Sequence, residues 1–304
     1  MSQVIQFTGS WPSFPLLRKL VIFGDSYSSV GFGRNRNAPN TQDLPQSDRP
    51  LGVSFPGDWM SMWNEPGTPN WVGYFITKYG SEPLYNPEVI QQSSEYMQRP
   101  YLIYDYAKGG DTVTLSSSGG ESGLAFAVEQ RFLVDTVKQH KDLTFEDALF
   151  VCWIGINDCA YSREHAQTID KIFSLHDRLY KEVHARNFMF VDVPPIERTP
   201  AVHRGSEESA GANYTNWNTT LQSSLDAFAV SHPDSTVLLY SSHTLFTRVL
   251  DSPTTYGFEQ SDAKQQRGRI WRDHLHPTTR IHDILAEDIA SFLKSVRPAA
   301  DGSK

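Results

Sequence analysis

The sequence predicts a three-layer α/β/α fold, because short apolar runs alternate along the chain with longer amphipathic stretches. Apolar runs bounded by turn residues are typical of strands that are buried on both faces, and strands separated by helices favour a parallel sheet. We expect a parallel five-stranded sheet, with strands at residues 19–23, 101–107, 148–155, 187–193 and 236–241.

The amphipathic stretches predict helices at residues 70–79, 122–140, 164–185, 214–231 and 278–296. In the last of these, Ile281, Leu285, Ile289 and Phe292 recur at helical spacing and form one apolar stripe. Right-handed crossovers between parallel strands would place helices on both faces of the sheet, in a flavodoxin-like arrangement. Ligands of such folds bind outside the carboxyl ends of the strands.

The chain of 304 residues contains no internal repeat and no clear linker, so we expect a single domain over residues 1–304. Residues 35–67 and 116–123 are rich in Pro, Gly and polar residues and are expected to be loops. The net charge of −8 disfavours nucleic acid or an anionic membrane as a partner. No apolar run approaches the length of a membrane span.

The two cysteines, Cys152 and Cys159, are expected to be free thiols, because one falls within a predicted strand and the other beyond its end. The first residues lack the basic and apolar regions of a signal peptide. The chain would therefore be intracellular or the mature form of a secreted protein. Glycosylation sequons at Asn213 and Asn218 favour secretion.

Small and reactive residues follow the ends of three predicted strands. Gly24-Asp25-Ser26 follows the first, Gly109-Gly110 the second, and Gly155-Ile156-Asn157-Asp158 the third. A fourth segment, "RDHLHPT", precedes the last helix and contains Asp273 and His276. Each segment alone is also typical of a turn or a helix cap.

Together these segments fit one mechanism, in which a serine hydroxyl attacks a carbonyl carbon. The Ser26 hydroxyl needs a neutral imidazole to take its proton, and His276 can do so with Asp273 fixing its tautomer. The N–H groups of Ser26 and Gly110 and the Asn157 amide are suitable donors to an oxyanion. The sequence contains no Gly-x-Ser-x-Gly elbow and no phosphate-binding loop, which disfavours an α/β-hydrolase and a nucleotide hydrolase.

A metal site is the alternative for the histidines. His274 and His276 could lie on one side of an extended segment, with Asp273 or His282 as further ligands. No cysteine lies nearby in the sequence, and we expect neither a metal nor a cofactor.

In order along the chain, "FGDSYS", "KGGDT", "GIND" and "DHLHP" resemble the sequence blocks of the GDSL-type esterases, the SGNH hydrolase superfamily. The resemblance extends from residue 23 to 277 and implies the SGNH hydrolase fold. It also implies Ser26 as nucleophile, Gly110 and Asn157 as oxyanion donors, and His276 as base with Asp273 behind it.

Three further stretches, at residues 66–75, 191–200 and 216–221, resemble fungal acetylesterases of carbohydrate esterase family sixteen. Such enzymes remove acetyl groups from sugars and xylo-oligosaccharides. The resemblance therefore implies hydrolysis of acetylated carbohydrates through an acyl-enzyme, with a small-molecule substrate and no metal, membrane or nucleic acid.

Asp111 departs from the family pattern, which has a small residue at this position. A carboxylate beside the oxyanion hole would disfavour developing negative charge unless it points away. Asp25 and Asp158 are expected to hold their own turns rather than to act chemically.

Two other functions fit the same sequence. A lipase, lysophospholipase or thioesterase of the same superfamily would have a longer acyl pocket, shaped by expected loops at residues 35–67 and 242–272. A non-catalytic carbohydrate-binding protein would use tryptophans as stacking platforms, with Trp59, Trp63, Trp71 and Trp153 as candidates.

Overall fold

The computed structural model describes residues 1–33, 44–57, 63–89, 91–114, 121–203 and 205–297. Its centre is a six-stranded sheet with the strand order β1-β6-β5-β4-β2-β3. The strands are β1 (Gln3–Gln6), β2 (Lys19–Gly24), β3 (Leu102–Asp105), β4 (Leu149–Trp153), β5 (Asn187–Val191) and β6 (Thr236–Tyr240). Strands β2 to β6 are parallel, and β1 pairs antiparallel with β6.

The five predicted strands are confirmed as β2 to β6, each within a few residues of its predicted bounds. Taken alone, they have the order second, first, third, fourth, fifth, which is the flavodoxin-like order. The predicted number of strands is wrong, because the structure adds β1 at one edge. The four residues of β1 include two glutamines and form no apolar run, so the sequence pattern does not reveal this strand.

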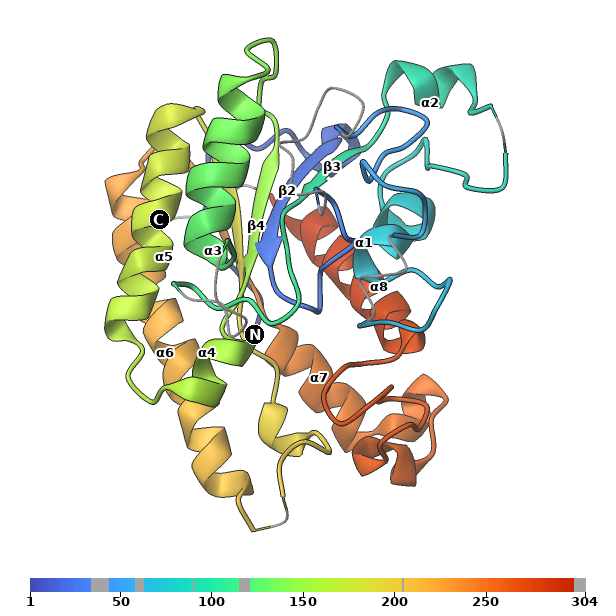
Figure 1. Cartoon of the computed structure of the whole chain (residues 1–304), viewed down its shortest axis with the longest axis vertical. Helices are drawn as coiled ribbons and strands as arrows, with labels where there is room; N and C mark the ends of the chain where they lie inside the picture. The colour runs from blue at the N-terminus through green and yellow to red at the C-terminus, as the bar shows by residue number, and fades with distance from the viewer. Residues whose placement is uncertain (34–43, 58–62, 90, 115–120, 204, 298–304) are drawn as a thin grey trace, which may run out of the picture.

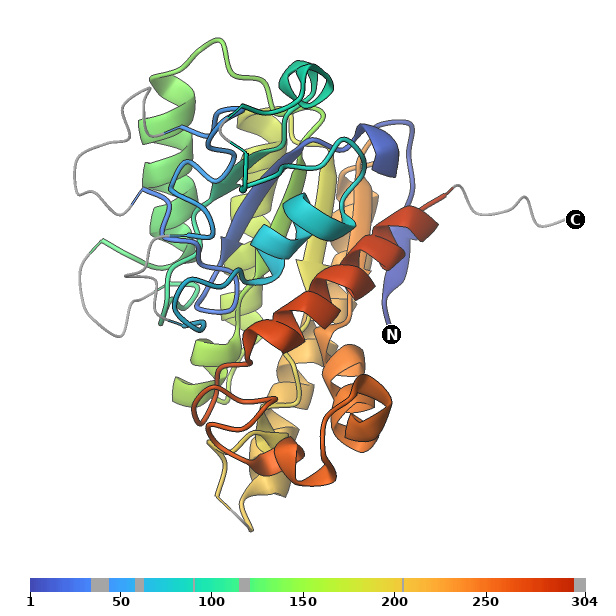
Figure 2. The same cartoon turned by 90° about the vertical axis from the view of Figure 1, so that its right-hand side faces the viewer.

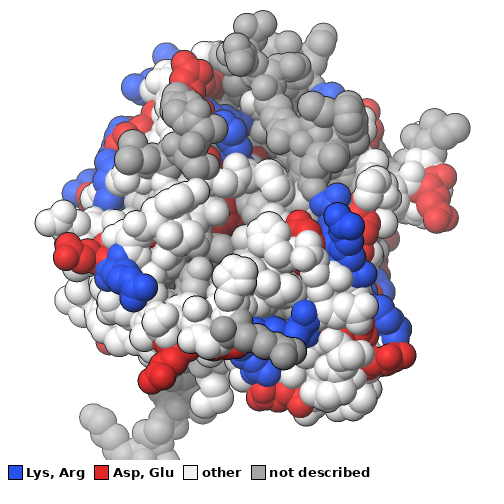
Figure 3. All heavy atoms as spheres, turned by 60° about the horizontal axis from the view of Figure 1, so that its bottom comes forward, with Lys and Arg blue, Asp and Glu red and all other residues white. Residues whose placement is uncertain are grey.

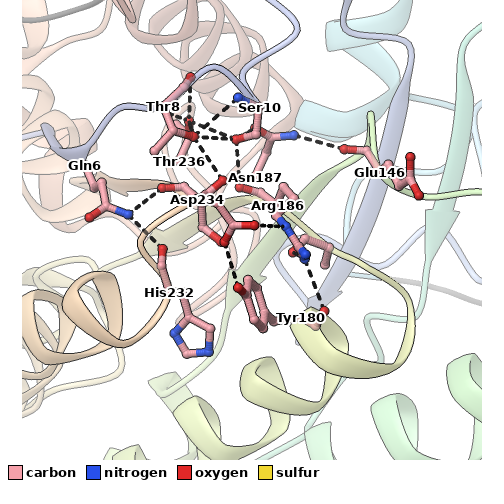
Figure 4. A network of polar contacts seen from close by, with 12 residues as sticks. Gln6, Thr8, Ser10, Glu146, Tyr180, Arg186, Asn187, His232, Asp234 and Thr236 are labelled. Atoms are coloured by element: carbon pink, nitrogen blue, oxygen red, sulfur yellow. Dashed lines mark hydrogen bonds and ion pairs between the residues drawn. The ribbon is translucent and has the colours of Figure 1, made fainter.

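Long-range polar contacts hold the β1 segment in place (Figure 4). The Gln6 amide donates to the carbonyls of His232 and Ser235 at 2.9 and 2.6 Å, and the Thr8 N–H donates to Thr236 Oγ1 at 3.1 Å. These partners lie more than 220 residues away in the sequence. The pairing of the first strand therefore depends on residues near the other end of the chain.

Helices cover both faces of the sheet (Figures 1 and 2). One layer contains α1 (Trp71–Tyr74), its π-helical continuation η3 (Phe75–Tyr79) and α8 (Thr279–Ser295). The other contains α3 (Leu124–Phe126), its π-helical continuation η4 (Ala127–Lys138), α5 (Ala166–Glu182) and α6 (Glu207–Ser231). All five predicted helices are present, and α6 begins two turns before its predicted start.

The structure also has helices at positions where no helix is expected. The segment at 242–272 contains α7 (Ser242–Asp251), and α4 (Ile156–Tyr161) begins immediately after the predicted end of the third parallel strand. A further helix, α2, spans Ser94–Gln98. Short 3₁₀ turns lie at Phe14–Leu16, Ile196–Arg198, Pro253–Tyr256 and Gln260–Lys264.

The core consists of the strand side chains and the apolar stripes of the covering helices. Trp71 and Trp153 are fully buried in it, so neither can serve as a stacking platform for a carbohydrate. Trp59 lies outside the described residues. Cys152 and Cys159 are buried free thiols, as predicted. Among the helices that the structure describes, none has the length and apolarity needed to cross a bilayer.

Candidate active site

Ser26 lies on a tight turn at the carboxyl end of β2. Asp25 Oδ1 accepts a hydrogen bond from the Tyr27 N–H at 3.1 Å, and the Asp25 carbonyl accepts from the Ser28 and Ser29 N–H groups. At Gly24, a Cβ would lie 2.6 Å from the Trp153 carbonyl, so only glycine lets β2 end here against β4. Asp25 therefore holds the turn, as predicted, and Ser26 remains 8% exposed.

The structure brings Ser26, His276 and Asp273 together in one hydrogen-bonded chain. His276 Nε2 lies 2.9 Å from Ser26 Oγ, and His276 Nδ1 lies 2.8 Å from Asp273 Oδ2. With a proton on Nδ1, the imidazole donates to the carboxylate and its free Nε2 accepts from the serine hydroxyl. This arrangement can draw a proton from Ser26 when the oxygen attacks a carbonyl.

The loop before α8 fixes the carboxylate of Asp273. Its Oδ1 accepts hydrogen bonds from the backbone N–H groups of Leu275 and His276 at 2.7 and 2.8 Å. Partial burial opposes ionisation of Asp273, but these bonds and the one from the His276 ring outweigh it and hold its pKa below the usual range. Asp273 is therefore ionised wherever the protein is folded at ordinary pH.

Gly110 lies at the corner of a turn that follows β3. The Asp111 N–H donates to the Lys108 carbonyl at 3.1 Å, and Gly110 has a φ of +81°. These are features of a type II turn, whose third residue needs a positive φ and is usually glycine. No described residue accepts a hydrogen bond from the N–H of Gly110 or of Ser26. Both donors therefore remain available to an oxyanion.

Two hydrogen bonds from the start of α4 hold this turn next to Asn157. Asn157 Nδ2 donates to the Asp111 carbonyl at 2.9 Å, and Asp158 Oδ1 accepts from the Val113 N–H at 3.0 Å. The first bond uses one of the two N–H bonds of the Asn157 amide and leaves the other for a ligand. Asp158 is thus a structural partner, as predicted, although it holds the neighbouring loop rather than its own.

The Asp111 side chain is buried, and its Oδ1 has no partner among the described residues. Burial, together with repulsion from Asp158, raises the pKa of Asp111 to about 6. In mildly acidic solution the group is therefore largely neutral, which weakens its repulsion of an oxyanion. The residue contributes to the site through its backbone carbonyl, which orients Asn157.

Two aromatic residues that lack an assigned role in the predicted site lie beside the imidazole. The ring centroids of Trp63 and His276 are 4.9 Å apart with an interplanar angle of 31°, and those of Tyr27 and His276 are 6.1 Å apart. The Tyr27 hydroxyl donates to the Leu275 carbonyl at 2.7 Å, which ties the nucleophile turn to the histidine loop. The position of Tyr27 next to Ser26 in the sequence is the one signal that could have indicated its role.

Asp105, at the end of β3, is another structural residue that sequence patterns do not single out. Its carboxylate accepts from the Ala107 N–H at 2.9 Å and from the Val30 N–H at 3.1 Å. It therefore joins the segment after Ser26 to the strand that leads to Gly110. His274, by contrast, is exposed and does not take part in the chain of Ser26, His276 and Asp273.

In the part of the chain that the structure describes, no group of three or more His, Cys, Asp or Glu side chains is placed to hold a metal ion. Figure 3 shows the end of the molecule where the parallel strands terminate, with most Lys and Arg side chains towards the rim of this face. Where grey atoms do not cover it, the middle of this face consists mainly of uncharged residues, with some Asp or Glu atoms visible among them.

Comparison with known proteins finds two relatives that match over most of this chain. An acetylesterase from Thermothelomyces thermophilus is 29% identical over 294 residues, covering 90% of this chain and 88% of the relative. A GDSL esterase/lipase from Arabidopsis thaliana is 22% identical over 343 residues, covering 94% of this chain and 92% of the relative.

Among solved structures, a putative GDSL-like lipase from Parabacteroides merdae superimposes with a TM-score of 0.51. It is 14% identical, and the match covers 93% of this chain and all of that one, which supports the fold alone. The model of the GDSL-like lipase/acylhydrolase family matches residues 20–289, a span that contains Ser26, Gly110, Asn157, Asp273 and His276. The chain belongs to the GDSL-like lipase/acylhydrolase family and is a carboxylic ester hydrolase of the SGNH type.

Proposed function

We propose that residues 1–304 form one domain whose serine esterase site removes acetyl groups from carbohydrate esters. The observation that carries the proposal is the hydrogen-bonded chain from Ser26 through His276 to Asp273, beside the free N–H groups of Ser26 and Gly110. Ser26 is the nucleophile, His276 the base and Asp273 its partner. Gly110 and Asn157 complete the oxyanion hole with the Ser26 N–H.

The reaction follows from this geometry. Ser26 Oγ attacks the acetyl carbonyl as its proton passes to His276 Nε2, and Asp273 stabilises the imidazolium that forms. The carbonyl oxygen becomes an oxyanion, which accepts from the N–H groups of Ser26 and Gly110 and from the Asn157 amide. His276 then gives its proton to the departing sugar oxygen and leaves an acetylated Ser26. A water molecule, deprotonated by His276, releases acetate and restores the serine.

The acetyl and carbohydrate parts of the proposal rest on three kinds of support. The relative from Thermothelomyces thermophilus is named an acetylesterase. Residues 66–75, 191–200 and 216–221 resemble acetylesterases that act on sugars. In the structure, Ser26 and His276 are 8% and 7% exposed, with Trp63 and Tyr27 beside the imidazole. Little space around the reacting atoms suits a short acyl group, and a mainly uncharged face suits a neutral sugar.

The test is hydrolysis of the p-nitrophenyl esters of acetate, butyrate and octanoate, followed by acetylated xylo-oligosaccharides, with Ser26→Ala as the control. We expect rates that fall steeply with acyl length, acetate release from the oligosaccharides, and no activity in the folded Ser26→Ala variant. Rates that rise with acyl length would instead favour a lipase or thioesterase. Turnover by Ser26→Ala at the normal rate would refute the assignment of the nucleophile.

A further inference from the structure

Trp63 contacts the proposed active site from a segment that no sequence block of the family includes. Its half-buried indole ring lies against the His276 imidazole, with centroids 4.9 Å apart and planes inclined by 31°. Of the aromatic rings near this imidazole, Trp63 is closer than Tyr27, whose centroid is 6.1 Å away. Trp63 therefore limits how far the base can turn away from Ser26.

A second contact places the indole against the turn at Gly109 and Gly110. A Cβ built on Gly109 would overlap with Nε1, Cε2 and Cζ2 of Trp63, far inside van der Waals contact. The backbone of Gly109 is not in the left-handed region, unlike that of Gly110. The backbone conformation alone would accept alanine at position 109, so the indole is the reason for this glycine.

The segment that carries Trp63 is fixed to the start of α8, close to His276. Glu65 Oε2 accepts a hydrogen bond from the Thr279 N–H at 2.6 Å, and Thr279 Oγ1 donates to the Pro69 carbonyl at 2.8 Å. Because Thr279 follows His276 by three residues and Glu65 follows Trp63 by two, these bonds join the segment that carries Trp63 to the segment that carries His276. No hydrogen bond among the described residues joins 273–276 directly to 108–111.

Hydrogen bonding does not explain the presence of a tryptophan at this position. Its Nε1 is buried and has no acceptor among the described residues. A buried donor without a partner is unfavourable, so the N–H opposes rather than favours the choice of tryptophan. The size and shape of the ring, which spans from His276 to Gly109, remain as the physical reason.

We propose that Trp63 is a positioning residue of the esterase site, a wedge that sets the spacing between the base His276 and the oxyanion turn at Gly109 and Gly110. This inference rests on the proposed function, because it needs both groups to act on one ester. The base and the turn come from different elements, and a displacement of about 1 Å between reacting groups can lower a rate about 100-fold. The wedge should therefore affect turnover more than substrate binding.

The experiment is a double-mutant cycle of Trp63→Ala and Gly109→Ala, read as kcat and KM on p-nitrophenyl acetate. We expect each single variant to lose about 10- to 100-fold in kcat, with KM changed less than about 3-fold. Because Gly109→Ala acts by displacing the indole, it should cost little once the indole is gone. The double variant should therefore match Trp63→Ala within about 3-fold.

Trp63→Phe keeps an aromatic ring against the imidazole and should recover most of the kcat that Trp63→Ala loses. If Trp63 were merely structural, kcat would not depend on this ring. Trp11→Phe is the matched control, since Trp11 Nε1 is also buried and unpartnered and the residue lies near the amino ends of the strands. This control should keep the kcat of the unaltered enzyme. Thermal unfolding of every variant verifies that it is folded.

Three outcomes would overturn the proposal for Trp63: an unchanged kcat in folded Trp63→Ala, a change confined to KM, or losses that multiply in the double variant. The first would leave the proposed function intact provided that Ser26→Ala is inactive. Normal turnover by Ser26→Ala would instead refute the proposed function, and the role of Trp63 with it.

Discussion

Replacing Asp273 by asparagine tests whether this carboxylate fixes the tautomer of His276. Asparagine has the same shape, and its carbonyl oxygen can take the place of Oδ1 and keep the bonds from the Leu275 and His276 N–H groups at 2.7 and 2.8 Å. In the unaltered protein, Asp273 Oδ2 lies 2.8 Å from His276 Nδ1. In the variant, the NH₂ group takes the place of Oδ2 and faces Nδ1. Because this group only donates, the imidazole must carry its proton on Nε2, where it cannot accept one from Ser26.

The expected loss of kcat follows from the free energy needed to turn the asparagine amide over. Turning the amide over would restore an acceptor to His276 but would point the NH₂ group at two backbone N–H groups, with the loss of two hydrogen bonds. At about 1–3 kcal/mol for each unsatisfied group, the turned form is disfavoured by about 2–6 kcal/mol. At about 1.36 kcal/mol per factor of ten, kcat should fall by about 30-fold to about 2.5 × 10⁴-fold.

The assay is kcat on p-nitrophenyl acetate, with thermal unfolding measured on the same samples. Asp273→Asn should unfold close to the temperature of the unaltered protein, because its two backbone hydrogen bonds persist. Asp273→Ala loses all three bonds and should be both inactive and less stable. Asp147→Asn, an exposed carboxylate paired with Lys19 at 2.9 Å, is the control and should change neither property. A folded Asp273→Asn protein with kcat within about 10-fold of normal would refute the reasoning.

The remaining predictions concern the oxyanion hole, the buried carboxyls and the sequons. Asn157→Ala should lower kcat by about 10²- to 10³-fold with little change in KM, and an unchanged kcat would remove Asn157 from the oxyanion hole. Burial raises the pKa of Asp105 to about 8 and that of Asp25 to about 7, so the folded protein keeps protons that the unfolded chain releases above about pH 4. The free energy of unfolding should therefore fall between about pH 6 and pH 8, by up to about 1.4 kcal/mol per pH unit for each titrating group. Urea titrations in which the free energy of unfolding rises over this range would contradict the prediction. The Asn213 side-chain amide donates to the Cys159 and Ser162 carbonyls, and the Asn218 side chain pairs with the backbone of Val193. Both amide groups are therefore engaged within the fold. Peptide mass spectrometry of protein secreted from a eukaryotic host should find no glycan at either residue.

The sequence was sufficient to predict the parallel sheet and the residues of the proposed site, because both depend on local patterns. An apolar run such as 148–155 indicates a buried strand by itself, and the residues that follow each parallel strand must lie at one edge of the sheet. Ser26, Gly110 and Asn157 can therefore be grouped from their positions after the strands alone. His276 and Asp273 can be paired because they are three residues apart in one loop.

The features that could not be predicted depend on contacts between distant residues. β1 is held by partners near residue 235, and α7 begins at a cap in which Ser241 Oγ accepts from the Thr244 N–H, within a segment expected to be a loop. The role of Gly109 requires Trp63, which lies 46 positions earlier and is not part of any block. Periodicity and turn composition contain no information about such pairs.

Each of the three loops at the proposed oxyanion hole carries a buried carboxylate oxygen that lacks a hydrogen-bond partner among the described residues. Asp25, Asp111 and Asp158 each have one buried carboxylate oxygen without a partner among the described residues, and burial raises the pKa of all three to about 6 or 7. Buried polar groups are normally paired, so three unpaired oxygens on adjoining loops lower the stability of the fold there. The same residues use their other oxygens or their backbone to hold the turns that present Ser26, Gly110 and Asn157. Unfavourable local features of this kind are expected where a structure serves function rather than stability, and here they coincide with the donors that must face an oxyanion.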